Sequence, residues 1–133
     1  MTMASRHALG VGLGQGASRE EAEDLVRRVL AQAGLSLSSG VMLATVDLRL
    51  GDPVLSHIES LLRARFQGFT VAELEVLTPR LLNPSDAVYR AIGCHGVAEA
   101  AALAAAGKAA TLQVAKMRHG KVTAALACNR EID

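Results

Sequence analysis

Residues 93–99, Gly-Cys-His-Gly-Val-Ala-Glu, have types and spacing that could form a ligand site. They lead into an alanine-rich segment that predicts a helix over residues 97–106, in which Glu99 is the single charge. A helix N-terminus carries unpaired N–H groups and partial positive charge, and glycine allows a ligand to approach the backbone closely. Glu99 is therefore either a favourable first-turn carboxylate or, if burial raises its pKa, a general acid or base. The ligand-binding candidates in this junction are Gly93, His95, Gly96, Val97 and Glu99.

A second candidate is the glycine-rich run of residues 10–16, which follows a short apolar segment and precedes a helix that begins after Ser18. Residues 12–17 match the G-x-G-x-x-G/A dinucleotide fingerprint in form. However, the acidic Asp47 lies 30 residues after the end of that match, where the fingerprint expects about 20. The run is better interpreted as an anion site ahead of the helix, or as a tight turn packed beneath it. The candidates here are Gly12, Gly14, Gly16 and Ser18.

Four further polar residues follow predicted elements or interrupt them. Asp47 follows the apolar strand of residues 41–46, at the carboxyl edge where α/β sheets bind ligands; it could instead cap or pair with Arg49. Lys116 interrupts an apolar strand, as a snorkelling edge residue or as a cation for a ligand carboxylate. Asn83 and Ser85 fit a turn and a helix N-cap. Asp47 and Glu99 are the candidate catalytic carboxylates, and no nucleophile can be identified.

Composition excludes several classes of protein. The net charge is +1 and the chain has three aromatic residues (one Tyr, two Phe), so a basic stripe with stacking aromatics for nucleic acid is absent. Two cysteines do not make a secreted disulfide scaffold, and the histidines lack zinc spacing. No apolar run approaches membrane-spanning length. We therefore expect a cytoplasmic protein that binds no membrane, metal or cofactor.

The elements that must position these residues predict one α/β domain over residues 1–133. Apolar strands are predicted near residues 9–13 and 41–46, and two more, 111–117 and 121–128, around a turn at 118–120. Capping boxes at Ser18/Glu21 and Thr70/Glu73 begin two helices, and Asp52-Pro53 begins another. The expected fold is layered, with helices packed on a mixed β-sheet that ends in an antiparallel hairpin.

In this order, the landmarks resemble the CobE family, which also forms the C-terminal domain of the cobalamin-biosynthesis protein CbiG. The first landmarks are residues 9–18, Leu-Gly-Val-Gly-Leu-Gly-Gln-Gly-Ala-Ser, and 43–47, Leu-Ala-Thr-Val-Asp. The others are residues 83–85, Gly93, the Gly-Val-Ala-Glu-Ala of 96–100, Gly107, 114–116 and 123–127. The resemblance covers about residues 8–127 and is closest to the free-standing CobE form, which belongs to the aerobic, late-cobalt route to vitamin B12.

The resemblance implies a role in corrin-ring synthesis with a precorrin as ligand. CbiG is associated with opening a δ-lactone of cobalt-precorrin-5A, an activity that need not reside in its C-terminal domain. The leading hypothesis is an accessory or carrier protein that binds a precorrin. The alternatives are a hydrolase or isomerase with Glu99 or Asp47 as general base, and a small nucleotide- or phosphate-binding module. Other enzymes of the pathway, and a second copy paired along the hairpin edge, are further candidate partners.

Overall fold

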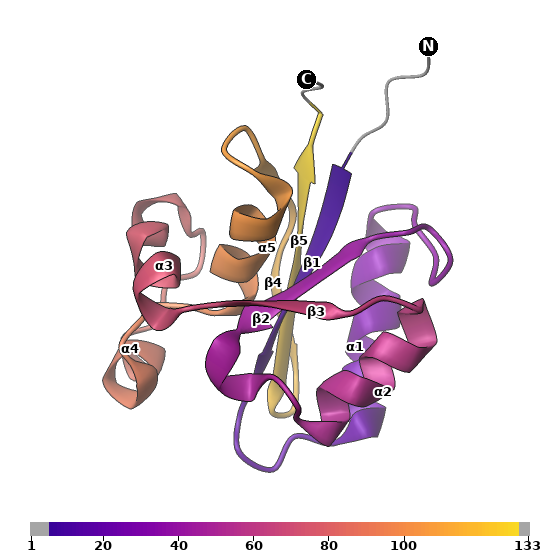
Figure 1. The fold of residues 1–133 in the computed structure, drawn as a ribbon, viewed down its shortest axis with the longest axis horizontal. Helices are drawn as coiled ribbons and strands as arrows, with labels where there is room; N and C mark the ends of the chain where they lie inside the picture. Colours follow the sequence, from indigo (N-terminus) through magenta and orange to yellow (C-terminus); the bar gives the residue numbers. More distant parts are fainter. Residues whose placement is uncertain (1–5, 131–133) are drawn as a thin grey trace.

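The structure, a computed structural model, describes residues 6–130. It forms one α/β domain in which helices cover both faces of a five-stranded sheet (Figure 1). The strands are β1 (Arg6–Leu13), β2 (Met42–Val46), β3 (Phe66–Phe69), β4 (Thr111–His119) and β5 (Val122–Asn129). The α-helices are α1 (Arg19–Gln32), α2 (Pro53–Leu62), α3 (Val71–Val76), α4 (Asp86–Ile92) and α5 (Ala98–Ala106). Short 3₁₀ helices, η1 (Asp47–Arg49) and η2 (Thr78–Arg80), follow β2 and α3.

The sheet is mixed, as the sequence predicts. Its strand order is β3-β2-β1-β5-β4, with β1, β2 and β3 parallel and β5 antiparallel to both β1 and β4. β5 pairs with β1 along its whole length, from Arg6 opposite Asn129 to Leu13 opposite Val122. β4 is therefore an edge strand, and its pairing with β5 is interrupted by two register shifts.

The two faces of the sheet differ in side-chain size. The face beneath α1 and α2 carries large apolar residues that form the main core with both helices; on β1 these are Leu9, Val11 and Leu13. The opposite face, beneath α5, carries small residues, among them Ala8, Gly10, Ala44 and Ala127. α5 consequently lies very close to the sheet: a Cβ added to Gly10 would be 1.9 Å from the carbonyl oxygen of Ala98. α3 and α4 lie beyond α5 on this side (Figure 1).

The predicted helix boundaries are confirmed where caps define them. Both capping boxes form, at Ser18/Glu21 and at Thr70/Glu73, and the Asp52 carboxylate accepts from the backbone N–H of Val54 at the start of α2. Each cap satisfies backbone donors that a helix leaves unpaired. Local sequence therefore sets where these helices begin.

The structure corrects the sequence analysis at two places. β3 was not predicted because it has only four residues, Phe-Gln-Gly-Phe, too few for a clear alternation. β4 runs two residues further than predicted and β5 begins one residue later, so the turn is Gly120-Lys121 rather than residues 118–120. Gly120 has φ +59°, a conformation glycine adopts without strain. Over residues 6–130, no helix has both the length and the apolarity needed to cross a bilayer.

Candidate functional site

The Glu99 carboxylate lies at the centre of a buried hydrogen-bond network beside the N-terminus of α5. Its side chain is on the second residue of the helix, and the residue is 2% exposed. One oxygen accepts from the backbone N–H groups of Leu82 (3.0 Å) and Asn83 (2.9 Å). The other accepts from the Asn83 side-chain amide (3.0 Å) and the backbone N–H of Lys116 (2.9 Å). Glu99 therefore joins the loop before α4 to strand β4.

The pKa of Glu99 is lowered, the opposite of the raised value that the acid–base alternative for this residue requires. Burial acts to raise this pKa, but the donors from Lys116, Asn83 and Leu82 outweigh burial and favour the ionised form. Both carboxylate oxygens accept hydrogen bonds from the protein. These donors could not be predicted from the alanine residues that surround Glu99 in the sequence. Glu99 is a structural carboxylate rather than a free general base.

Lys116 and Asn83 are brought together by the same network. The Lys116 ammonium donates to the main-chain carbonyl of Asn83 at 3.2 Å. Within residues 6–130 the structure gives Lys116 no ion pair with a carboxylate. The lysine thus holds a positive charge at the loop surface with hydrogen-bonding capacity to spare, since an ammonium has three donors.

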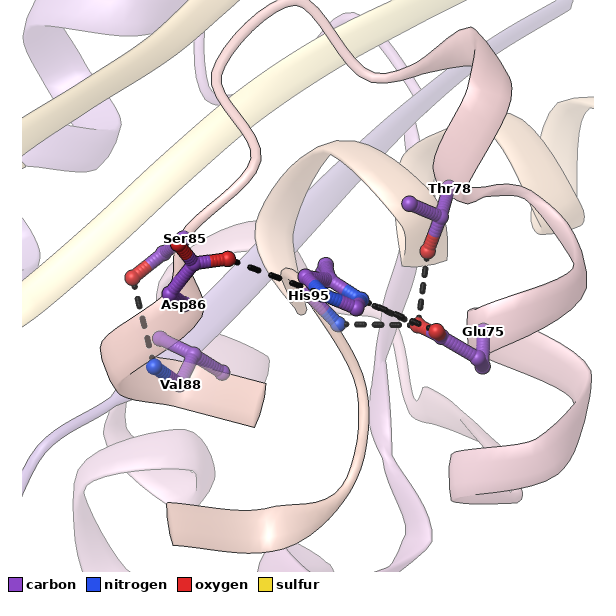
Figure 2. Close-up of polar contacts among 6 residues, drawn as sticks. All are labelled: Glu75, Thr78, Ser85, Asp86, Val88 and His95. Atoms are coloured by element: carbon purple, nitrogen blue, oxygen red, sulfur yellow. Dashed lines mark hydrogen bonds and ion pairs between the residues drawn. The ribbon is translucent and has the colours of Figure 1, made fainter. Parts of the chain in front are cut away.

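His95 belongs to a second polar cluster, on the α3–α4 side of the junction (Figure 2). Its Nδ1 lies 3.0 and 2.9 Å from the two carboxylate oxygens of Glu75 in α3, and its backbone N–H donates to the same carboxylate at 3.0 Å. Its Nε2 faces the Asp86 carboxylate at 3.7 Å, and its ring stacks on Tyr89 with centroids 4.4 Å apart. Hydrogen bonds from the Thr78 hydroxyl (2.6 Å) and from His95 lower the pKa of Glu75.

The remaining junction residues shape the chain between these two clusters. Gly93 ends α4 with φ +95°, and a Cβ on Gly96 would lie 3.1 Å from the Leu81 side chain. Val97 is the N-cap of α5 and makes no side-chain capping bond. Ser85 caps α4 through its hydroxyl, while its N–H donates to the carbonyl of His95 at 2.7 Å. Turn, packing and capping explain these residues without a ligand.

Packing, turn geometry and hydrogen bonds within the protein account for the glycine-rich run of residues 10–16. Gly12 lies in β1, where an added Cβ would meet the Thr123 hydroxyl at 2.5 Å, so close packing explains it. The N–H of Gly14 donates to the carbonyl of Lys121, and Gly16 has φ +86° in the turn. The N–H of Ser18 donates to the Glu21 carboxylate. The N–H groups that an anion would need at Gly14 and Ser18 already have protein acceptors.

Asp47 lies where it was expected, at the carboxyl end of β2, as the first residue of η1. It is exposed, and the alternative pairing with Arg49 is not among the ion pairs of residues 6–130. Across that same part of the chain, no three His, Cys, Asp or Glu side chains are grouped so that they could hold a metal ion.

The structure thus brings Asn83, Glu99 and Lys116 into direct contact and places His95 in a neighbouring cluster. Four members of that cluster were not predicted from the sequence: Glu75, Thr78, Asp86 and Tyr89. Glu75 resembles any acidic residue of a short exposed helix, so its sequence context contains no signal. Tyr89 could have been singled out as the one tyrosine of an aromatic-poor chain.

Comparison with known proteins identifies relatives of this chain. The family described as Cobalamin synthesis G C-terminus matches residues 7–127. The protein CobE of Sinorhizobium sp is 38% identical over 119 residues, which cover 90% of this chain and 77% of that protein. The cobalt-precorrin-5A hydrolase of Priestia megaterium is 32% identical over 120 residues, and this chain spans only 31% of its length.

Two solved structures have the same fold. The crystal structure of CobE, a protein from the cobalamin (vitamin B12) biosynthetic pathway, matches with a TM-score of 0.85 and 34% identity, covering 96% of this chain and 93% of that one. The cobalamin biosynthesis protein chiG from Agrobacterium tumefaciens str. C58 matches with a TM-score of 0.69 and 26% identity, covering 94% and 99%. These matches agree with the mixed α/β fold expected from the sequence.

Proposed function

Because this chain belongs to the family of the cobalamin synthesis G C-terminus and is a protein of cobalamin biosynthesis, we propose that it binds a precorrin. A precorrin is a reduced tetrapyrrole with an extended apolar ring system and a rim of acetate and propionate groups. According to this proposal, the protein is an accessory or carrier that holds the intermediate. Two features of the protein surface support it.

The first and main support is the ammonium of Lys116. It lies on the loop surface without a carboxylate partner in the described part of the chain, and its one protein acceptor is the Asn83 carbonyl. The buried Glu99 fixes both the lysine backbone and the loop that carries the Asn83 carbonyl, so the two segments joined by the ammonium are held in place. A ligand carboxylate is the natural additional acceptor for such a group.

The second support is the distribution of exposed apolar side chains. The large hydrophobic residues with the greatest exposure all lie between β2 and α5 in sequence: Leu48, Leu50, Val76, Leu82 and Tyr89. Leu82 (63% exposed) directly precedes Asn83, and Tyr89 (47% exposed) stacks on His95. Exposed apolar surface at Leu82, next to the carbonyl that accepts from the Lys116 ammonium, suits a ligand that is apolar on its face and acidic at its rim.

The structure gives no comparable support for a hydrolase with Glu99 as its base or for a nucleotide- or phosphate-binding module. A hydrolase with Glu99 as its base requires a carboxylate that is free to take a proton, whereas this one is ionised and fully hydrogen-bonded. A nucleotide or phosphate module requires open N–H groups in the first loop, where those of Gly14 and Ser18 already have acceptors. Asp47 remains an exposed candidate at the sheet edge.

The test is a visible-absorbance titration of the protein with purified cobalt-precorrin-5A and with a cobalt-free precorrin. We expect a saturable spectral change with at least one of them, and an unchanged mass of the bound ligand. Lys116→Gln should weaken binding about 10-fold or more, because a hydrogen bond to a charged group contributes about 1.5–3 kcal/mol. Lys108→Gln is the matched control, since Lys108 is exposed in the turn after α5.

Absence of a spectral change with every precorrin tested, or equal affinity of the wild-type protein and Lys116→Gln, would contradict the proposal. A change in the mass of the bound ligand in ordinary water would instead indicate turnover by a hydrolase.

A further inference from the structure

We propose that His95, oriented by Glu75, is a proton-transfer group that moves a proton between carbon positions of the bound tetrapyrrole. The inference rests on the proposed function, since the tetrapyrrole is its substrate class. It assigns acid–base chemistry to the pair His95 and Glu75, although nothing in the sequence around Glu75 marks it as a functional residue.

The orientation of the imidazole is set from one side. The two oxygens of the Glu75 carboxylate lie 2.9 and 3.0 Å from the His95 Nδ1 (Figure 2). The carboxylate also accepts hydrogen bonds from the His95 backbone N–H (3.0 Å) and the Thr78 hydroxyl (2.6 Å). These donors hold the carboxylate ionised, with a lowered pKa. An ionised acceptor at Nδ1 places the ring hydrogen there, so the neutral ring has its lone pair on Nε2. A carboxylate–imidazole pair of this kind orients a general base.

The other side of the imidazole is partly exposed to solvent and faces a carboxylate. The His95 side chain is 25% exposed, and Nε2 faces Asp86, whose own side chain is 86% exposed and can be displaced by a ligand. The groups that face the ring from its packed elements are Glu75 on α3 and Asp86 and Tyr89 on α4. The adjacent Cys94 thiol is buried, and burial raises its pKa. A carboxylate therefore lies near each ring nitrogen, Glu75 at Nδ1 and Asp86 at Nε2.

Tyr89 gives the cluster a second property. Its ring is 47% exposed and lies nearly parallel to the imidazole, with an interplanar angle of 20°. The exposed aromatic surface can stack on a flat conjugated ligand.

The chemical step is a tautomerisation. A hydrogen on a ring carbon next to a C=N bond is weakly acidic; as the C–H bond breaks, its electron pair forms a C=C bond and the C=N electrons move to nitrogen. Nε2 takes the proton, and the resulting imidazolium returns it to the same carbon or to another position of the conjugated system. No oxidant, reductant or additional reactant is consumed, and the ligand keeps its composition.

Deuterium uptake tests this step. The protein is saturated with cobalt-precorrin-5A in D₂O, the ligand is returned to H₂O to remove deuterium from oxygen and nitrogen, and carbon-bound deuterium is measured by mass spectrometry over a range of pH. We expect faster uptake than in the free ligand and a rate that falls at least about 100-fold in His95→Gln. Glu75→Gln should bind the ligand, lose about 10-fold in rate and show a shifted pH profile, which a merely structural role would not produce.

His57→Gln is the matched control. His57 also pairs with a glutamate, Glu23, at 2.9 Å through its Nε2, but it lies on α2, on the opposite face of the sheet, and should exchange like the wild-type protein. Unchanged uptake in both His95→Gln and Glu75→Gln, or binding without faster uptake in the wild-type protein, would overturn this inference and leave precorrin binding intact. Failure of the wild-type protein to bind any precorrin would remove both proposals together.

Discussion

Replacing Glu99 by glutamine is the most informative single perturbation of this domain, because it changes the charge of the side chain and almost nothing of its size. The carboxylate accepts from four donors, two on each oxygen. Glutamine keeps one oxygen and replaces the other with an NH₂ group. Two of the four donors then face another donor instead of an acceptor.

The expected loss of stability follows from this count. A hydrogen bond to a charged group contributes about 1.5–3 kcal/mol, so two lost bonds correspond to about 3–6 kcal/mol. The Asn83 amide lies on an exposed residue and can turn to water, whereas the Lys116 backbone N–H is fixed in β4. We therefore expect the lower end of the range, about 3 kcal/mol.

Equilibrium urea unfolding of the wild-type protein and Glu99→Gln measures this difference. Glu20→Gln is the matched control: Glu20 is also the second residue of its helix, α1, but is exposed, so it should lose only the helix-dipole contribution of about 0.3–1 kcal/mol. A loss for Glu99→Gln no larger than that of Glu20→Gln would refute the reasoning.

The pH dependence provides an independent check on the same residue. Folding lowers the pKa of Glu99 below its ordinary value of 4.5, so the stabilisation is present above pH 4.5 and is lost as the pH falls through the folded-state pKa. The difference between the wild-type protein and Glu99→Gln should therefore be largest near neutral pH and shrink in acid. A difference that stays constant from pH 7 to pH 3 would contradict an ionised Glu99.

Two further predictions concern packing. Gly10→Ala should lower the thermal midpoint strongly and by more than Gly14→Ala, because its new Cβ would be 1.9 Å from the Ala98 carbonyl oxygen, whereas at Gly14 the nearest atom is 3.3 Å away; equal midpoints would show that α5 can move off the sheet freely. Cys94 and Cys128 are both buried, and burial raises the pKa of the Cys94 thiol, so we expect slow reaction with a thiol reagent at pH 8 in the native state and fast reaction of both in urea. Rapid native labelling would indicate frequent opening around α5 or β5.

The corrected role of Glu99 changes how the junction of residues 93–99 is understood. From the sequence alone, an acidic residue in an apolar helix is a candidate general base, because burial by itself would raise the pKa of its carboxyl group. Here the donors come from residues 16 and 17 positions away in the sequence. They convert a buried carboxylate into an anchor for the loop at Leu82 and Asn83 and for the strand that carries Lys116.

The sequence by itself determined the elements whose signals are local. Capping residues such as Ser18 and Thr70 satisfy donors within three residues, so the helix starts could be predicted from neighbouring letters. The apolar runs of the strands, and glycine in the hairpin turn, likewise depend on nearby residues. The ordered landmarks were also enough to place the chain in its family, which residues 7–127 match.

Tertiary structure decided what the polar residues do. The four-residue β3 exists because β2 offers it a parallel partner, and Gly10 and Gly12 are required by the close approach of α5 and β5 rather than by a phosphate. Glu75 meets His95 across 20 positions, and Glu99 meets Lys116 across 17. The protonation of a carboxylate depends on the donors that surround it in space, and those donors are assembled only when the helices pack on the sheet.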